Sequence, residues 1–262
     1  MSLLPPVVPP LSPARENYHR DLPVGMAFKW LAAGGRDMMT QPASSLVYGV
    51  VVLLASVTVI VGMGLLGWEQ VLFPALAGFM VVGPIVAVGL YEKSRRIALR
   101  ERATLANMIF VKAASGSQIL FIGALLVLLM LLWMRAAVII YALFFGLRPF
   151  PGLDHIASML LMTPVGWSML IVGGSVGALF AALSFSISIF AVPMLLDKDV
   201  DAFTAMGTSM ALVWNNLPVM VCWGLIVATL FALCVATGLL ALVVVFPLLG
   251  HASWHAYKAV QA

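Results

Sequence analysis

The chain has 262 residues, of which 63% are hydrophobic and 9% are charged, and its mean hydropathy is +1.10. Soluble domains carry roughly 45–50% apolar and about 25% charged residues, so this composition excludes a water-soluble globular protein. It predicts an all-α, polytopic membrane protein with one membrane domain over residues 21–262. The net charge of +4 does not indicate a nucleic-acid partner, because in membrane proteins the position of basic residues matters more than their sum.

The first 20 residues are predicted to form a disordered, proline-rich cytoplasmic tail. No basic segment precedes their apolar residues, which argues against a signal peptide. Five prolines interrupt the stretch: Pro5, Pro6, Pro9, Pro10 and Pro13.

A helix needs about 20 apolar residues to cross a hydrocarbon core of about 30 Å. Six runs meet this requirement, at about 46–67, 71–91, 119–146, 167–196, 217–236 and 239–257. The last two come from one long apolar stretch, which we divide at Thr237 and Gly238. The sequence therefore predicts a bundle of six transmembrane helices.

Basic residues set the predicted orientation. With six spans both termini lie on one side, and most lysines and arginines fall there: Arg15, Arg20, Lys29, Arg36, Lys93, Arg95, Arg96, Arg100, Arg102, Lys112, Lys198 and Lys258. Only Arg135 and Arg148 fall toward the other side. Because positive residues mark the cytoplasmic face, we place both termini in the cytoplasm.

Two amphipathic segments, 24–39 and 200–216, are predicted to lie at that face as interfacial helices. Each leads into a proline that opens a span. Pro84 and Tyr91 stand seven residues apart, as do Pro247 and Trp254. These similarities predict a parallel internal duplication, with the third and fourth spans between the two copies.

Some residues point to helix packing. Gly173, Gly177 and Ala181 recur at four-residue spacing in the fourth span, a pattern that lets helices approach closely in lipid. Pro84 and Pro247 each free a backbone carbonyl and kink their helix, which favours a position inside the bundle. A substrate path along the small residues is the alternative reading.

Four residues near one membrane face form a candidate metal site. His251 and His255 are four residues apart and share a helical face, and Asp197 and Asp199 add carboxylates. The alternative is that these residues are solvated ends of helices.

Motifs of catalysis are absent from the sequence: it has no HExxH pair, no glycine-rich phosphate loop and no CxxCH haem attachment. No Asp or Glu lies in the middle of a predicted span, which argues against a proton-coupled pump. We therefore expect a protein that is not an enzyme and has no cofactor.

Two motifs resemble an uncharacterised bacterial integral-membrane family, some of whose members are labelled putative cytochrome c oxidase subunits. One runs from Phe246 to Lys258 (FPLLGHASWHAYK), and the other from Ala191 to Asp197 (AVPMLLD), followed by Asp201 and Ala202. The resemblance covers most of the chain after residue 20. It implies a six-span fold in the bacterial inner membrane and no established activity.

Three functional hypotheses follow. The first is an accessory or assembly subunit of a respiratory, oxidase-type complex, with membrane lipids and other integral subunits, or further copies of itself, as partners. The second is a transporter or channel for a small neutral solute. The third is metal handling through the two histidines and two aspartates.

Overall fold

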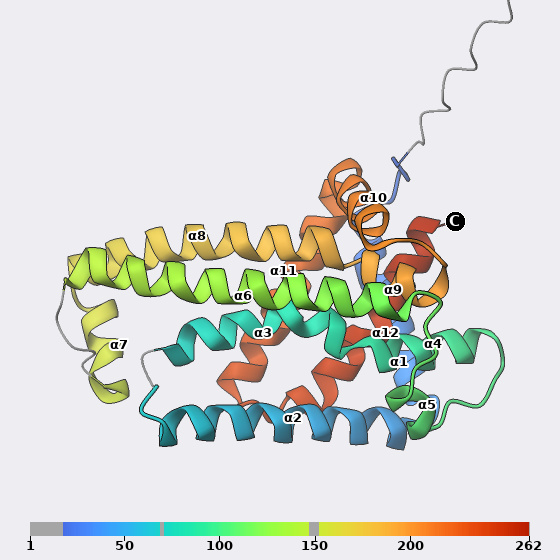
Figure 1. The fold of residues 1–262 in the computed structure, drawn as a ribbon, viewed down its shortest axis with the longest axis horizontal. Helices are drawn as coiled ribbons and strands as arrows, with labels where there is room; N and C mark the ends of the chain where they lie inside the picture. The colour runs from blue at the N-terminus through green and yellow to red at the C-terminus, as the bar shows by residue number, and fades with distance from the viewer. Residues whose placement is uncertain (1–17, 69–70, 147–151, 262) are drawn as a thin grey trace, which may run out of the picture.

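The computed structural model describes residues 18–68, 71–146 and 152–261, and these residues form an all-α fold (Figure 1). Residues 1–17 of the predicted tail, and Arg148, lie outside the described residues. The helices are α1 (Met26–Met39), α2 (Pro42–Leu65), α3 (Leu72–Val86), α4 (Val88–Ala98), α5 (Leu105–Ile109), α6 (Gly116–Phe145), α7 (Leu153–Leu161), α8 (Pro164–Ser188), α9 (Ala191–Asp197), α10 (Ala202–Asn215), α11 (Leu217–Ala236) and α12 (Leu242–Gln261).

Five helical stretches within the described ranges are long and apolar enough to cross a membrane. They are Pro42–Leu65, Pro74–Ala98, Gly116–Phe145, Pro164–Asp197 and Leu217–Ala236, each overlapping one predicted span. The second joins α3 with α4 and the fourth joins α8 with α9. In Figure 1, α2, α3, α6 and α8 run along the long axis, and α6 packs against both α3 and α8.

The sixth predicted span, 239–257, needs correction. Helix α12 occupies this range, but it is not among the helices apolar enough to cross a membrane. Its first half is apolar, whereas its second half carries His251, His255 and Lys258. The prediction failed because it counted the uninterrupted apolar run and gave too little weight to these polar residues.

Helix α12 is instead enclosed by protein, mainly by α1, α2 and α4. Glycines permit this close packing. A Cβ atom on Gly49 would lie 2.2 Å from the carbonyl oxygen of Val243, and one on Gly34 would lie 2.5 Å from the nitrogen of Ala252. The backbone of α12 thus touches two other helices, a distance that only small residues allow in a membrane protein.

The predicted amphipathic segments are α1 and α10. Helix α1 buries Trp30, whose ring meets Trp223 edge-on with centroids 5.9 Å apart. Helix α10 leaves Phe203 exposed. Both ends of the described chain lie at one end of the bundle, because the Arg20 side-chain Nε donates a hydrogen bond to the carbonyl oxygen of Val260 at 2.8 Å.

The internal duplication stays a prediction. In its favour, α1 and α10 both have 14 residues, and each precedes a helix with proline in its first turn. Pro84 lies inside α3 and Pro247 inside α12. Against it, α3 belongs to a candidate span and α12 does not.

The small residues of α8 face α6 in part. A Cβ atom on Gly177 would lie 2.9 Å from the ring of Trp133, and one on Gly173 would lie 3.9 Å from Ile140. Ala181 lines a small cavity of about 120 Å³ that also includes Pro84, and Pro247 is buried in α12. Gly174 is exposed, with no atom near its would-be Cβ, so the stripe also continues on the outside of the bundle.

The contact between α2 and α12 predicts a matched pair of variants. Gly49→Ala forces the new methyl group into the backbone of Val243, and we expect it to lower the free energy of unfolding by about 1–3 kcal/mol. Gly62→Ala in the same helix meets open space and should be neutral or slightly stabilising. Thermal unfolding in detergent measures both; equal midpoints would contradict the close contact.

Candidate functional site: a buried polar network

Buried polar side chains gather where α1, α2, α4 and α12 meet. Ser45, Lys93 and His251 have no exposed surface, Ser94 is 1% exposed and Asp37 is 8% exposed. Burying so many polar groups is costly unless each finds a partner. This network is therefore the strongest candidate for a functional or structural site in the described residues.

His251 stands at the centre of this network. Its Nε2 lies 2.9 Å from the Ser45 hydroxyl oxygen on α2, and its Nδ1 lies 2.8 Å from the Ser94 hydroxyl oxygen on α4. Lys93 donates hydrogen bonds to the Ser45 hydroxyl at 2.7 Å and to the carbonyl oxygen of Gln41 at 2.9 Å. One imidazole ring thus ties α12 to two other helices.

The donors and acceptors can be ordered consistently. Lys93 can only donate, so the Ser45 oxygen accepts from it and the Ser45 proton goes to Nε2 of His251. Nδ1 of the neutral imidazole then donates to Ser94, whose proton goes to the Asp37 carboxylate. This chain links an ammonium group to a carboxylate through a neutral histidine.

Burial and charge explain why His251 stays neutral. Burial, followed by the positive charge of Lys93, lowers the pKa of His251 from about 6.5 to about 3. Burial acts to raise the pKa of Asp37, but hydrogen bonds from His255 and Ser94 outweigh it, so that pKa is lowered. Nε2 of His255 lies 2.8 Å from Asp37, which fastens α12 to α1.

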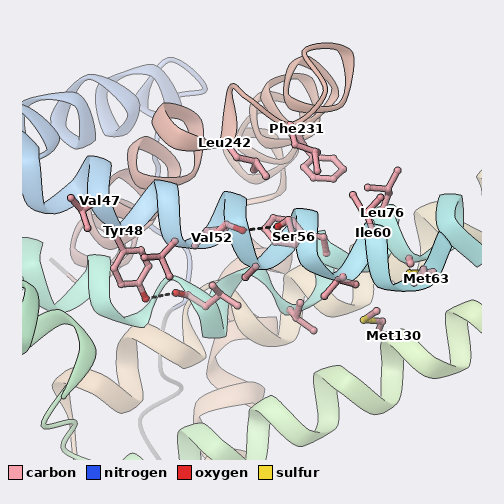
Figure 2. Close-up of a pocket in the computed structure, with 18 of the residues that line it drawn as sticks. Val47, Tyr48, Val52, Ser56, Ile60, Met63, Leu76, Met130, Phe231 and Leu242 are labelled. Atoms are coloured by element: carbon pink, nitrogen blue, oxygen red, sulfur yellow. Dashed lines mark hydrogen bonds between the residues drawn. The ribbon is translucent and has the colours of Figure 1, made fainter. Parts of the chain in front are cut away.

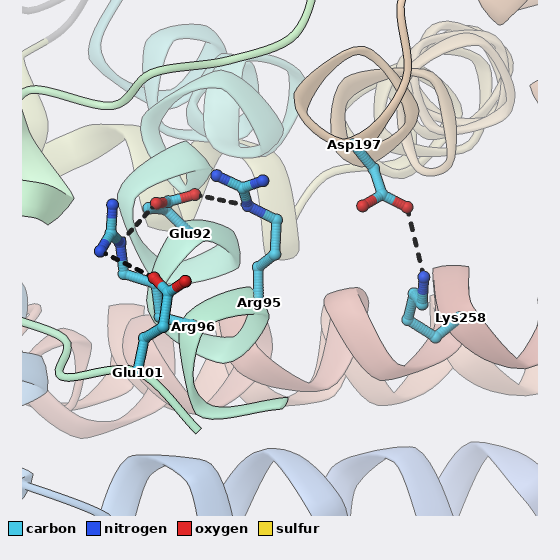
Figure 3. Close-up of polar contacts among 6 residues, drawn as sticks. All are labelled: Glu92, Arg95, Arg96, Glu101, Asp197 and Lys258. Atoms are coloured by element: carbon cyan, nitrogen blue, oxygen red, sulfur yellow. Dashed lines mark hydrogen bonds and ion pairs between the residues drawn. The ribbon is translucent and has the colours of Figure 1, made fainter. Parts of the chain in front are cut away.

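A second polar group lies on the next face of α4. Glu92 is fully buried and accepts hydrogen bonds from Arg95 at 2.7 Å and Arg96 at 2.6 Å, as Figure 3 shows. Arg96 also pairs with the exposed Glu101 at 3.1 Å. These contacts hold the turn after α4 onto the helix itself.

Asp197 at the end of α9 binds α12. It accepts hydrogen bonds from the Tyr257 hydroxyl at 3.1 Å and from Lys258 at 3.2 Å, the latter drawn in Figure 3. Burial, together with the negative charge of Asp197, raises the pKa of Tyr257. The tyrosine therefore remains a hydrogen-bond donor at physiological pH.

The predicted metal residues separate into different contacts. His251 bonds two serines, His255 bonds Asp37, Asp197 bonds Tyr257 and Lys258, and Asp199 accepts a hydrogen bond from Ser115. Among the described residues, no group of three or more His, Cys, Asp or Glu side chains is placed to hold a metal ion. The structure does not bring the four together, and metal binding stays a prediction.

The Ser45 hydroxyl has the neighbours that a nucleophile needs, a histidine and a lysine within hydrogen-bond distance. All three side chains have no exposed surface. Their hydrogen bonds cross-link α2, α4 and α12.

A separate apolar groove lies along α2. Its cavity of about 580 Å³ is lined by α2, α3 and α5, with Met130, Phe231 and Leu242 from other helices (Figure 2). The end of the groove near α5 includes Tyr48, whose hydroxyl donates to the carbonyl oxygen of Val86 at 2.7 Å. The groove thus has an apolar wall and no unpaired hydroxyl at this end.

These helices carry the match to a known family. Residues 72–197 match the family described as predicted integral membrane protein (DUF2189). The DUF2189 stretch begins with the first residue of α3, ends with the last residue of α9 and covers just under half of the chain. No curated protein and no solved structure matches the chain. With its five candidate spans, the chain is a multi-pass integral membrane protein.

The DUF2189 stretch holds only part of the buried network. It includes Lys93 and Ser94, but not Asp37, Ser45 or His251. Of the two motifs in the sequence, AVPMLLD lies within the match and FPLLGHASWHAYK lies beyond it.

Sequence reasoning found the two histidines but missed their partners Asp37, Ser45, Lys93 and Ser94. In the structure α4 continues through Lys93 and Ser94 beyond the hydrophobic run, but in the sequence these two residues look like an ordinary polar end of a span. Nothing in the sequence pairs these residues with His251, which is 157 positions beyond Ser94.

The low pKa of His251 predicts a pH effect on stability. The unfolded chain takes up the proton near pH 6.5 and the folded chain only near pH 3, so stability is full above pH 6.5 and falls as pH drops below it. The slope should reach about 1.4 kcal/mol per pH unit. Thermal unfolding between pH 7 and pH 4.5 measures it. His251→Asn should flatten this slope, whereas the exposed His155→Asn should keep it; the same slope in all three proteins would contradict the assignment.

The two glutamates that share Arg96 give a second comparison. Glu92→Gln leaves Arg95 and Arg96 without their buried carboxylate, and we expect a loss of roughly 3 kcal/mol, at the low end for a buried pair because both arginines reach water. Glu101→Gln removes an exposed partner and should cost less than about 1 kcal/mol. Denaturation in detergent separates them; similar losses would show that Glu92 is not the anchor.

Proposed function

We propose that the chain is a non-catalytic accessory or assembly subunit of a larger bacterial inner-membrane complex, of the respiratory, oxidase type. The observation that carries this proposal is that the ionisable groups buried in the molecule lie at one end of the bundle, whereas its cavities are apolar. Its buried ionisable groups are held in hydrogen-bonded networks at one end of the bundle, and the two cavities described above are lined almost wholly by apolar side chains. Such a molecule offers packing surfaces to neighbours in the membrane, which supports a non-catalytic role.

Two of the spans, α2 and α6, leave most of their length uncovered by the rest of the chain. Only 17% of the most apolar window of α2, and the same share in α6, is buried inside the chain. On α8, Gly174, Ala178 and Ala182 are exposed at four-residue spacing, the pattern with which helices of different subunits approach in lipid. These surfaces suit integral membrane partners as well as lipid.

The basic residues support a cytoplasmic position for both termini. Arg20, Lys198 and Lys258 belong to the end of the bundle where the two described chain ends meet. Positive residues mark the cytoplasmic side of membrane proteins. We assign that end to the cytoplasm.

A small-solute carrier or channel is the second candidate function. The observation that favours it is the groove beside α2, which is large enough for a small molecule and lies among the spans. Its apolar lining would restrict the solute to a neutral or apolar compound.

Co-purification tests the accessory-subunit proposal. The tagged full chain, extracted from native membranes in a mild detergent, should elute with a large assembly that shows a haem spectrum. Elution alone as a monomer or dimer without haem would contradict the proposal and favour the carrier reading.

A pair of glycine variants sharpens this experiment. Gly174→Leu and Gly62→Leu both place a large side chain where the chain itself leaves open space, so neither should unfold the protein. If the α8 stripe contacts the partner, Gly174→Leu should strip the partner from the eluted complex and Gly62→Leu should not. Equal retention by both variants would place the contact elsewhere.

A further inference from the structure

We propose that the groove between α2 and α3, together with the basic residues on either side of α5, binds one anionic phospholipid. One acyl chain lies in the groove, and the phosphate lies against Arg102 and Lys112. This site is distinct from the buried network and does not depend on the proposed function.

The groove has the dimensions and chemistry of an acyl-chain site. Its lining runs along α2 from Val47 to Met63, which is roughly 24 Å at the rise of an α-helix. One leaflet contributes about half of a hydrocarbon core of about 30 Å, so the groove is longer than the leaflet is thick and can hold an acyl chain over its full length. Figure 2 shows apolar side chains along this whole length, and the Ser56 hydroxyl there is bonded to the carbonyl oxygen of Val52.

The groove opens sideways from the bundle. Val51 and Val59 on its rim are 59% and 60% exposed, and both belong to a candidate membrane span. The material in contact with such a rim in the membrane is lipid. A lipid chain therefore reaches the groove without leaving the hydrocarbon layer.

The basic residues stand at one mouth of this groove. Leu105 and Ile109 of α5 line it, and Arg102 and Lys112 each lie three residues away along the chain. Figure 1 places α5 beside the Pro42 end of α2. The two cations thus flank α5 along the chain, and α5 lies at this end of the groove.

Both cations are available for a phosphate. Arg102 and Lys112 are exposed, and neither forms an ion pair among the residues that the structure describes. The neighbouring acid, Glu101, is engaged by Arg96. Charge complementarity at the mouth therefore selects an anionic headgroup over a zwitterionic one.

The short helix α5 has the character of a membrane-interface element. Ile109 and Phe110 are 66% and 80% exposed, next to the exposed Lys112. Apolar side chains beside a cation suit the boundary between headgroups and acyl chains. A headgroup at Lys112 would leave these two side chains in the acyl layer.

Lipid titration of the delipidated full chain tests the site. Native mass spectrometry in detergent measures the binding of phosphatidylglycerol and phosphatidylcholine with identical acyl chains. We expect one phosphatidylglycerol to bind more tightly than phosphatidylcholine. Arg102→Gln combined with Lys112→Gln should weaken it roughly twenty-fivefold, since each basic residue contributes a factor of roughly five, and should weaken phosphatidylcholine binding less, because the choline cation offsets its phosphate.

Matched controls distinguish binding at this site from a general attraction of basic residues for anionic lipid, and from misfolding of the variants. Lys29→Gln with Arg36→Gln removes two exposed charges from α1 and should keep the preference for phosphatidylglycerol. Ala55→Trp fills the groove and should weaken both lipids, whereas the exposed Leu54→Trp, outside the lining, should weaken neither. Equal binding of the two lipids by the unmodified chain, or equal losses in the two charge variants, would overturn the proposal.

Discussion

The two hydrogen bonds of His251 hold together the part of the structure on which the rest depends. The imidazole ring joins α12 to Ser45 on α2 and to Ser94 on α4, over sequence separations of 206 and 157 residues. Each bond needs the other nitrogen to be correctly protonated, so the ring must be neutral and in one tautomer. Lys93 and Asp37 stand at the two ends of this series of hydrogen bonds and favour that arrangement, because the Lys93 ammonium can only donate and the Asp37 carboxylate can only accept.

The physical constraint behind this network is the cost of burying polar groups without partners. The polar half of α12 is enclosed by protein, so its side chains must find their partners there. Helix α12 meets this constraint by lying among α1, α2 and α4, and the glycines at 34 and 49 let its backbone come close enough for the short side chains of serine to reach the histidine. Close packing and hydrogen bonding therefore require each other here: a wider separation would leave the serines and the histidine unpaired.

Hydropathy predicted much of the fold because a span is a local property. The predicted range 217–236 coincides with α11. The ends of four other predicted spans lie within about two helical turns of the ends of the observed helices. The two amphipathic segments were also predicted, because the periodicity of apolar residues along a helix is likewise a local property. The short helices α5 and α7 were missed, since five and nine residues give little periodicity to detect. The i, i+4 spacing of His251 and His255 indicated a shared face, but their partners come from three other helices, and no local pattern reveals such pairings.

The bonded end of the molecule also bears on the choice between the two candidate functions. A carrier must exchange two arrangements of its helices, and the exchange has to break or carry along whatever joins them. Here α1, α2, α4, α9 and α12 are cross-linked by hydrogen bonds, and separating them would leave several polar groups unpaired, among them the fully buried Ser45 and His251. Any large motion is thus confined to the apolar parts of the spans beyond the network, where the groove beside α2 is already open to the side. A molecule that is fastened at one end and apolar along its flanks can hold neighbouring lipids and helices in place, as the proposed accessory subunit would have to do.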